Sequence, residues 1–385
     1  MPEGPMAPKI IIATTEITTG GLGSYLRSLI DGLGDRGWEV HLLVANTQGD
    51  HFSEVSKNIR CHDLSGVPLS PKKVFMAAEI ADGIDPDVIL LNNCALMHYA
   101  LPLVNHTTKA VAVLHSDDPR FYAIGSLFPR YLFRWVAPTP GVRNRFQPFL
   151  KKNLREKVRV IPHGVDGGKF YRTTSPKEQT MQVLFVGFLG ESKGADVLPG
   201  IFQKVAGEVP GATLNIVGKG PLESALKEEF RKRGLQERVS FHGPKSRDET
   251  AALMRSSDIL LLPTRLEGFG IAIVEAMMCG VVPVVSRLEG ITDQLVEDGK
   301  SGILVSPGDV DGFSDAIKHL SHDRKTLGEL SARASSFAAD RFSLNTMLDR
   351  YESLFAEPVE GKLPRRSRPA WYAEAAVQYL RKRLR

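Results

Sequence analysis

The sequence predicts an α/β protein built from two doubly wound domains in tandem, which face each other across a cleft. The chain has 385 residues, more than one compact core usually holds. Short apolar runs of strand length alternate with helical patterns, as in doubly wound domains. The order strand, glycine-rich loop, helix, strand occurs twice, once near the start of the chain and once after its middle.

The first copy begins with an apolar run over Lys9–Thr15, followed by the loop ITTGGLG. The next residues place apolar side chains at the spacing of one helical face: Tyr25, Leu26, Leu29, Ile30 and Leu33. Gly37 ends that helix, and Glu39–Ala45 is the next strand. Further strands of this half are expected at Val88–Asn92 and Ala110–His115. Strands this uniformly apolar are typical of parallel sheets covered by helices on both faces.

The second copy starts at Gln182–Gly187, continues through the loop FLGESKG into a helix around Asp196–Val209, and returns as the strand Ala212–Val217. Four more strands are expected in this half, at Val239–Phe241, Ile259–Pro263, Val282–Ser286 and Gly302–Val305. Both halves therefore have the pattern of a Rossmann-like domain. We expect residues 1–163 to form the first domain, 164–340 the second, and 341–385 a C-terminal segment with a basic tail.

The composition, 42% hydrophobic and 24% charged, is that of a soluble globular protein and excludes a disordered or fibrous chain. Three cysteines, Cys61, Cys94 and Cys279, cannot build a disulfide framework and are not spaced as zinc ligands, which fits a reducing compartment. No run approaches the roughly 20 apolar residues of a membrane-spanning helix. The start of the chain lacks the pattern of a signal peptide. We expect a cytoplasmic protein.

Positive charge gathers in two segments of the chain. Residues 361–385 hold eight Lys or Arg against one acid, and residues 128–160 hold nine against one, with aromatic residues between them. Each segment has two interpretations: contact with an anionic membrane surface, or packing in the first domain. For the tail, the apolar stripe along Ala370–Leu384 would make that contact. Nucleic acid ranks last as a partner because no known binding module accompanies the basic residues.

The strongest local signal lies in Asp258–Gly280, where an apolar strand, a tight loop and a helix follow one another. Gly268 and Gly270 let the backbone approach a ligand closely, and the free amides of the helix's first turn suit a phosphate. Glu275 lies five residues beyond Gly270, or about 7.5 Å along a helix axis. That distance is close to the one between the diphosphate and the ribose of a nucleotide.

Two carboxylates beside a diphosphate would repel it unless they face neutral hydroxyls. Carboxylates are strong hydrogen-bond acceptors, so sugar hydroxyls are suitable partners for Glu267 and Glu275. Lys193, in the loop FLGESKG, can balance the charge of the phosphate. The alternatives are an ordinary surface glutamate in a loop for Glu267, and a helix glutamate paired with a lysine or arginine for Glu275. The GGLG loop by itself also resembles a dinucleotide fingerprint, but Leu26 stands at the third glycine position, which makes a nicotinamide site a weak hypothesis.

These elements together resemble the family 4 glycosyltransferases, the large retaining group with the two-domain GT-B fold. The likeness covers about residues 9–356 and is strongest over 158–310. Its most specific part is the pair Glu267 and Glu275 with GFG between them. The other matching elements stand in the family's order: TTGGLGSYLRSLIDGLGDRGWEVHLL, VLHSDDP, VRVIPHGVD, VGFLGESKGADVL, LNIVGKGP and EGITDQLVEDGKSGILVSPGD.

The resemblance implies that the second domain binds a nucleotide-diphosphate sugar donor. Glu267 would hold hydroxyls of the donor sugar, and Glu275 those of the ribose. Lys193 would contact the diphosphate. The backbone around this site would assist, and its residues are Gly268, Phe269, Gly270 and Ile271.

The resemblance also implies that the first domain contributes the acceptor side and that helices in 341–385 cross back to it. Gly20 and Gly21 would approach the diphosphate, and His115 would contact the donor sugar. Of all these residues, His115, Lys193 and Glu267 are the expected catalytic ones. The acceptor would be a glycan or a lipid-linked molecule, in the synthesis of cell-surface polysaccharide or glycolipid. Such enzymes retain the anomeric configuration, and the resemblance implies neither an essential metal nor a bound cofactor.

Two departures from the family pattern bear on activity. Phe188 stands where members usually carry an arginine in the phosphate loop, so one positive charge is missing. The turn after the second glutamate is also altered, and we expect Arg287 as a substitute cation. The competing hypothesis is a catalytically degenerate protein that binds nucleotide or glycan as a scaffold.

Overall fold

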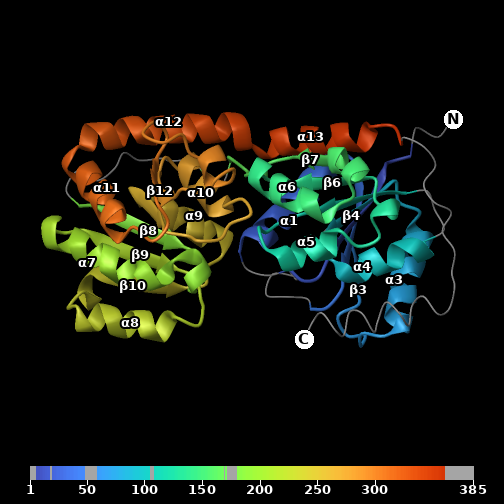
Figure 1. Cartoon of the computed structure of the whole chain (residues 1–385), viewed down its shortest axis with the longest axis horizontal. Coiled ribbons are helices and arrows are strands. Elements are labelled where there is room, and N and C mark those ends of the chain that lie inside the picture. Colours follow the sequence, from blue (N-terminus) through green and yellow to red (C-terminus); the bar gives the residue numbers. More distant parts are fainter. Residues whose placement is uncertain are drawn as a thin grey trace. The chain divides into compact units, whose positions relative to one another are not determined.

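The computed structural model describes residues 6–17, 20–47, 59–104, 108–168, 170 and 180–359. The chain divides into two compact units (Figure 1). Unit 1 is Met1–Pro162 together with Met347–Arg385, and unit 2 is His163–Thr346. The sequence-based expectation set the boundaries after residues 163 and 340. The basic tail, including the stripe Ala370–Leu384, lies outside the described residues.

Unit 1 contains a seven-stranded sheet in the order β3-β2-β1-β4-β5-β6-β7, with every neighbouring pair parallel. Its strands are β1 (Lys9–Thr14), β2 (Glu39–Val44), β3 (Arg60–Asp63), β4 (Val88–Asn92), β5 (Lys109–Val113), β6 (Arg134–Ala137) and β7 (Val158–Val160). Its helices are α1 (Gly21–Asp35), α3 (Pro71–Ile84), α4 (Ala95–Ala100), α5 (Pro119–Gly125), α6 (Pro140–Phe146) and, from Met347 onward, α13 (Leu344–Ala356).

Unit 2 contains a six-stranded parallel sheet in the order β10-β9-β8-β11-β12-β13. Its strands are β8 (Gln182–Val186), β9 (Thr213–Val217), β10 (Val239–Gly243), β11 (Ile259–Leu262), β12 (Val282–Ser286) and β13 (Ile303–Val305). Its helices are α7 (Leu198–Glu208), α8 (Glu223–Lys232), α9 (Arg247–Arg255), α10 (Ile271–Met278), α11 (Val310–His322) and α12 (Arg324–Phe342).

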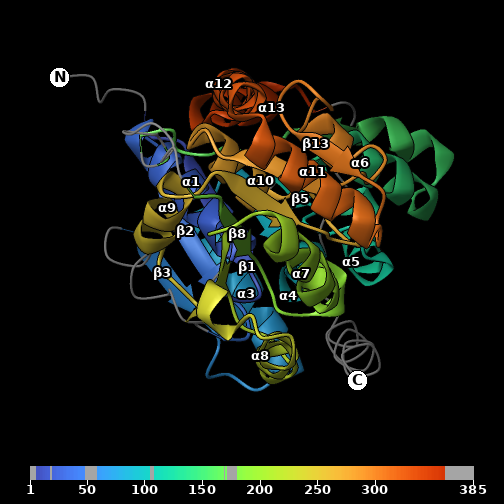
Figure 2. The ribbon, with the colours of Figure 1, turned by 90° about the vertical axis from the view of Figure 1, so that its left-hand side faces the viewer.

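Helices cover both faces of the sheet in unit 2. In Figure 2, α7 and α8 lie on one side of β8, and α9 and α10 lie on the other. Helix α7 packs against α8 and α11, while α10 packs against α9 and α12. Because both faces are covered, the central strands are apolar throughout: β11 reads ILLL, and all four residues are buried. The predicted pair of Rossmann-like domains is confirmed.

The basic, aromatic segment 128–160 belongs to the fold of unit 1. It contains β6, α6 and β7, and most of its aromatic side chains are buried: Tyr131, Phe133, Trp135 and Phe146. Phe149 is exposed, with 43% of its surface accessible. Burial therefore favours the packing interpretation for this segment, because aromatic rings that fill a core cannot enter a membrane surface.

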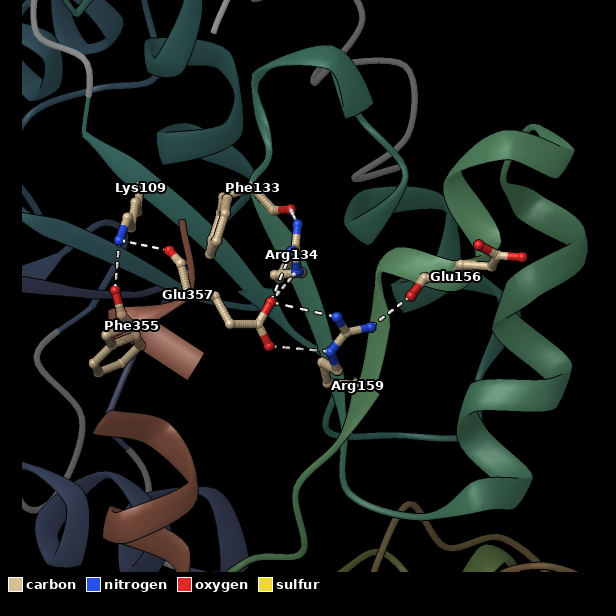
Figure 3. A network of polar contacts seen from close by, with 7 residues as sticks. All are labelled: Lys109, Phe133, Arg134, Glu156, Arg159, Phe355 and Glu357. Atoms are coloured by element: carbon tan, nitrogen blue, oxygen red, sulfur yellow. Dashed lines mark hydrogen bonds and ion pairs between the residues drawn. The ribbon is translucent and has the colours of Figure 1, made fainter. Parts of the chain in front are cut away.

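A network of charged side chains fixes the end of α13 to unit 1 (Figure 3). Lys109 Nζ donates to the carbonyl oxygens of Phe355 and Glu357, at 2.6 and 2.9 Å. A cation at these carbonyls stabilises the C-terminal end of a helix. Arg134, which is 3% exposed, and Arg159 both donate to the Glu357 carboxylate, at 2.8 and 3.3 Å through their Nε atoms.

Burial alone would raise the pKa of Glu357, but the hydrogen bonds from Arg159 and Arg134 outweigh it and lower the pKa. The folded protein therefore holds this carboxylate ionised more firmly than the unfolded chain does. Its contribution to stability is complete above the unfolded pKa, and it is lost as the pH falls through the lower, folded pKa.

We predict that Glu357→Gln destabilises unit 1, because it leaves the buried Arg134 guanidinium without a carboxylate. The expected cost at pH 7 is about 2 kcal/mol, or a fall in Tm of roughly 5 °C by calorimetry. The loss of stability should shrink as the pH falls below the usual pKa range of a glutamate, because the native carboxylate then becomes protonated as well.

The matched control is Glu156→Gln. Glu156 accepts a hydrogen bond from Arg159 through its backbone carbonyl, at 2.6 Å, and its side chain is exposed (Figure 3). This variant should unfold within about 1 °C of the native protein. Equal Tm values for the two variants would contradict the role assigned to the Glu357 carboxylate.

Candidate functional site

Two neighbouring loops of unit 2 are bound to each other at the carboxyl end of the sheet. The first follows β8 and ends at Gly194, and the second follows β11 and leads into α10. The carbonyl oxygen of Ser192 accepts hydrogen bonds from the amide of Arg265 at 2.8 Å, the amide of Leu266 at 3.1 Å and Thr264 Oγ1 at 3.0 Å. The shape of the second loop therefore depends on one carbonyl of the first.

Gly194 lets the two loops approach this closely. Its φ of +69° is left-handed, and a Cβ built there would lie 1.9 Å from the carbonyl oxygen of Pro263. A second link joins the guanidinium of Arg265 to the carboxylate of Asp196, with contacts of 2.6 and 2.8 Å. Strands β8 and β11 are also neighbours in the sheet. The loops thus form a rigid frame for the side chains they carry.

The frame brings together Lys193 and Glu267, two of the residues singled out in the sequence. Lys193 Nζ donates to Glu267 Oε1 at 2.5 Å. The side chain of Glu267 is 8% exposed and that of Lys193 is 27% exposed. Solvent therefore reaches the ammonium more easily than the carboxylate. The pair offers a cation and a strong hydrogen-bond acceptor to one ligand.

Glu275 lies on α10, which follows directly from the second loop. Gly270 precedes the helix with a φ of +101°, and the first helical residue is Ile271. Glu275 is buried, and its Oε1 lies 3.9 Å from Nε of Arg247. Arg247 begins α9 and places its guanidinium 5.2 Å from the centre of the Phe170 ring.

Sequence reasoning missed Arg247. A signal for it exists, because Ser246 and Glu249 form a capping box that marks the start of α9 after strand β10. The residue after that cap stands at the carboxyl end of the sheet, where ligands of doubly wound domains bind.

The side chain and the backbone of Phe269 have different roles. Its side chain is 2% exposed and packs against the rings of His163 and Phe342, at centroid distances of 5.1 and 5.7 Å. The ring therefore stabilises unit 2. Gly268 and Gly270, on either side of it, are also buried. Any ligand contact of this segment would involve its backbone.

The two departures from the family pattern have different surroundings. Phe188 is 52% exposed and lies on the same loop as Lys193. Arg287 follows β12, and its guanidinium forms an ion pair with Asp298. The guanidinium that was expected to replace the missing cation is therefore already paired with a carboxylate, which belongs neither to Glu267 nor to Glu275.

The remaining predicted residues lie in unit 1. Gly20 and Gly21 are exposed at the start of α1, where Gly20 has a φ of +125°. His115 follows β5, and its Nε2 lies 2.9 Å from Oδ1 of Asn92, the last residue of the neighbouring strand β4. The ring of Tyr25 packs edge-on against His115, with 4.9 Å between centroids.

Desolvation lowers the pKa of His115 to about 3. The ring is therefore neutral at physiological pH, and it can exchange hydrogen bonds but carries no charge. Asn92 was missed in the sequence, although a polar residue ending an apolar strand at the ligand-binding edge is a usable signal.

Two features are absent from the described residues. Within these residues no group of three or more His, Cys, Asp or Glu side chains is arranged to hold a metal ion. None of the described helices is both long and apolar enough to cross a membrane.

Comparison with known proteins identifies the family. Residues 19–168 match the family model described as Glycosyltransferase Family 4, and residues 169–338 match the model described as Glycosyl transferases group 1. The N-acetyl-alpha-D-glucosaminyl L-malate synthase of Bacillus anthracis is 25% identical over 376 residues, which covers 88% of this chain and 94% of that protein. The D-inositol 3-phosphate glycosyltransferase of Paenarthrobacter aurescens is 31% identical over 254 residues, 60% of either protein.

A solved structure shares the fold. The crystal structure of Anabaena HepE with UDP-glucose superposes with a TM-score of 0.78 at 21% identity, covering 91% of this chain and all of that one. The two family models together span both units, and the fold of the solved structure is the same. The chain therefore belongs to the family 4 glycosyltransferases of the GT-B fold, and it is a glycosyltransferase.

Proposed function

We propose that this glycosyltransferase moves a sugar from a nucleoside-diphosphate donor bound by unit 2 to a glycan or lipid-linked acceptor, with retention of the anomeric configuration. The observation that carries the proposal is the contact of 2.5 Å between Lys193 and Glu267. Together these two side chains complement a sugar joined to a diphosphate, which is neutral at one end and anionic at the other.

In this proposal Glu267 holds the donor sugar. A nearly buried carboxylate that accepts hydrogen bonds from two sugar hydroxyls fixes the ring without needing a charge on it. Lys193 then lies beside the leaving diphosphate. The first amides of α10 after Gly270 add the positive end of a helix dipole.

The chemistry follows from these charges. The bond between the anomeric carbon and the phosphate oxygen breaks, and its electron pair stays on the diphosphate. The acceptor hydroxyl forms the new bond on the same face, and its proton passes to a phosphate oxygen. Lys193 and the backbone amides stabilise the negative charge that builds up on the leaving group. We propose that the reaction needs no metal ion and no bound cofactor.

Glu275 is proposed to hold the ribose hydroxyls of the nucleotide. Its burial and its position on α10, beyond the backbone proposed to receive the diphosphate, support this role. Arg247, 3.9 Å away, keeps the carboxylate oriented. The solved structure of HepE contains UDP-glucose, so uridine diphosphate sugars are the donors to test first.

Unit 1 is proposed to receive the acceptor. His115, neutral and oriented by Asn92, would contact the donor sugar, and Gly20 and Gly21 would approach the diphosphate. The named relatives act on L-malate and on inositol 3-phosphate, so small anionic acceptors are candidates besides a glycan or a lipid-linked molecule. Synthesis of cell-surface polysaccharide or glycolipid in the cytoplasm is the proposed setting, with the basic tail as the segment that contacts the inner face of the membrane.

A second candidate is a degenerate protein that binds nucleotide without turnover. The exposed Phe188 favours it, since the phosphate loop then carries one cation fewer than in most members. Of the three predictions below, the first and third test the nucleotide site that both candidates share, and the second, on turnover, distinguishes them.

The first prediction concerns nucleotide binding. Among UDP, GDP and ADP at 1 mM, one should raise the Tm of the native protein by several degrees. Glu275→Gln should weaken that nucleotide about tenfold by calorimetric titration, because it weakens hydrogen bonds to the ribose. The control is Glu297→Gln on the exposed surface of the same unit, with unchanged affinity expected. If no nucleotide binds, both candidate functions are wrong.

The second prediction concerns turnover. Hydrolysis of the matching sugar nucleotide should fall about 100-fold or more in Lys193→Met and in Glu267→Gln, since each removes a group that acts on the reacting bond. Far-ultraviolet circular dichroism checks that both variants are folded. Lys204→Met serves as the control, because its ammonium pairs with Asp311 on the surface. Nucleotide binding without turnover of any donor would favour the scaffold.

The third prediction concerns Phe188. A Phe188→Arg variant places a cation on the loop of Lys193, so the Kd for the matching nucleoside diphosphate should fall about tenfold at low salt. The gain should be smaller for the nucleoside monophosphate. Phe188→Gln, which is polar but uncharged, should leave the Kd within about twofold. An arginine without effect would mean that the diphosphate binds away from this loop.

A further inference from the structure

A buried lysine in unit 1 has no role in the site described so far. Lys73 belongs to the first turn of α3 and is 3% exposed, the most completely buried lysine among the described residues. Its backbone amide donates to Ser70 Oγ, the cap of that helix, at 3.4 Å. Within the part of the chain that the structure describes, its ammonium forms neither a hydrogen bond nor an ion pair.

An ammonium in such a place is costly. Removing a charge from water costs several kcal/mol unless a partner compensates for it. Desolvation lowers the pKa of Lys73, and the nearby Cys94 and Asp63 oppose that shift. Asp63 is thus within electrostatic reach, but it is not in contact with the ammonium. The donors of Lys73 are left for a group that the described residues do not supply.

The ammonium also keeps some access to solvent. The buried side-chain atoms that lack a hydrogen-bond partner within the described ranges belong to other residues. The small accessible area of Lys73 therefore includes its ammonium group. A small molecule arriving from solvent can reach the charge.

Lys73 lies at the carboxyl edge of the sheet, where ligands of doubly wound domains bind. Asp63 is the last residue of β3, and Cys94 comes two residues after the end of β4. Gly20, Gly21 and His115 follow β1 and β5 at the same carboxyl edge of unit 1. The N-terminal end of α3 adds its positive dipole at this point.

We propose that the Lys73 ammonium binds an anionic group, a carboxylate or a phosphate, of the acceptor substrate. This inference rests on the proposed function, because it assumes that unit 1 receives the acceptor. An anion beside Lys73 supplies the missing charge partner and fixes one end of the acceptor. Asp63 keeps the lysine protonated without occupying its donors.

The experiment measures anion binding apart from the donor site. The protein carries Lys193→Met, so that the donor-side lysine cannot contribute. Glycerol 3-phosphate and L-malate are the probes, with glycerol and sodium chloride of equal ionic strength as references. At least one of the two anions should raise the Tm. Stabilisation by glycerol 3-phosphate indicates a phosphate site, and stabilisation by L-malate indicates a carboxylate site.

Lys73→Met should abolish that stabilisation, with an apparent Kd at least about tenfold weaker. Its Tm without anion should be equal or higher, since a buried charge is replaced by an apolar side chain of similar length. Lys72→Met is the matched control, because Lys72 is the adjacent, exposed lysine on the same turn. It should bind the anions as before, and Lys73→Arg should retain most of the affinity.

A measurement on the native side chain guards against a variant that does not fold. Acetylation of Lys73, followed by mass spectrometry, should slow about fivefold or more in the anion's presence, while Lys72 reacts unchanged. Stabilisation that survives in Lys73→Met, or acetylation indifferent to the anion, would overturn the proposal.

Turnover distinguishes failure of this inference from failure of the proposed function. With Lys193 intact, Lys73→Met should raise the KM of an anionic acceptor about tenfold and leave donor hydrolysis by water within about twofold. If the donor is hydrolysed but the rate of sugar transfer to the anionic acceptor does not depend on Lys73, only this inference is overturned. Anion binding without turnover of any donor would overturn the proposed function and, with it, the assignment of the anion to an acceptor.

Discussion

The candidate site of unit 2 depends on one carbonyl oxygen. Ser192 accepts hydrogen bonds from three donors of the loop after β11, and these bonds set the path of the chain that carries Glu267. The contact is possible only because Gly194 has no side chain where it meets Pro263. A shift of either loop by 1 Å would separate Lys193 from Glu267, and positioning errors of that size are costly to enzymes.

The backbone and the side chains have different roles in this site. Glycines and buried aromatic rings, such as Gly270 and Phe269, determine where the chain runs. Charged side chains then occupy the positions that this path makes available. Lys193 and Glu267 are adjacent because β8 and β11 are neighbours in the sheet, and neighbours in a parallel sheet end at the same edge.

Much of the fold could be predicted because the central strands are uniformly apolar. The interior strands β1, β4, β8 and β11 stood out for this reason. Three strands did not: β3 reads RCHD, β6 reads RWVA and β7 reads VRV, and their charged residues conceal the pattern. In β6, Arg134 is buried only because Glu357, 223 residues away, reaches it, and no local pattern contains that partner.

For the site, sequence reasoning could group Lys193, Glu267 and Glu275 because each follows a strand of the same half. The direction in which each side chain points could not be predicted from the sequence. Packing sets the rotamers of Arg247 and Arg287. These rotamers direct Arg247 toward Glu275 and Arg287 toward Asp298. Sequence spacing fixes which residues share an edge, and the folded structure decides which of them touch.

Unit 1 is built from two separate stretches of the chain, and this affects how the protein folds during its synthesis. Helix α13 completes this unit, with Tyr351 bonded to Tyr25 at 2.7 Å and Glu357 held by two arginines. During translation these residues leave the ribosome after the whole of unit 2. The first 162 residues must therefore wait, incompletely packed, while the unit synthesised second can already reach its native state. Residues 1–162 of a nascent chain are therefore exposed to misfolding until α13 has been synthesised and packs on them.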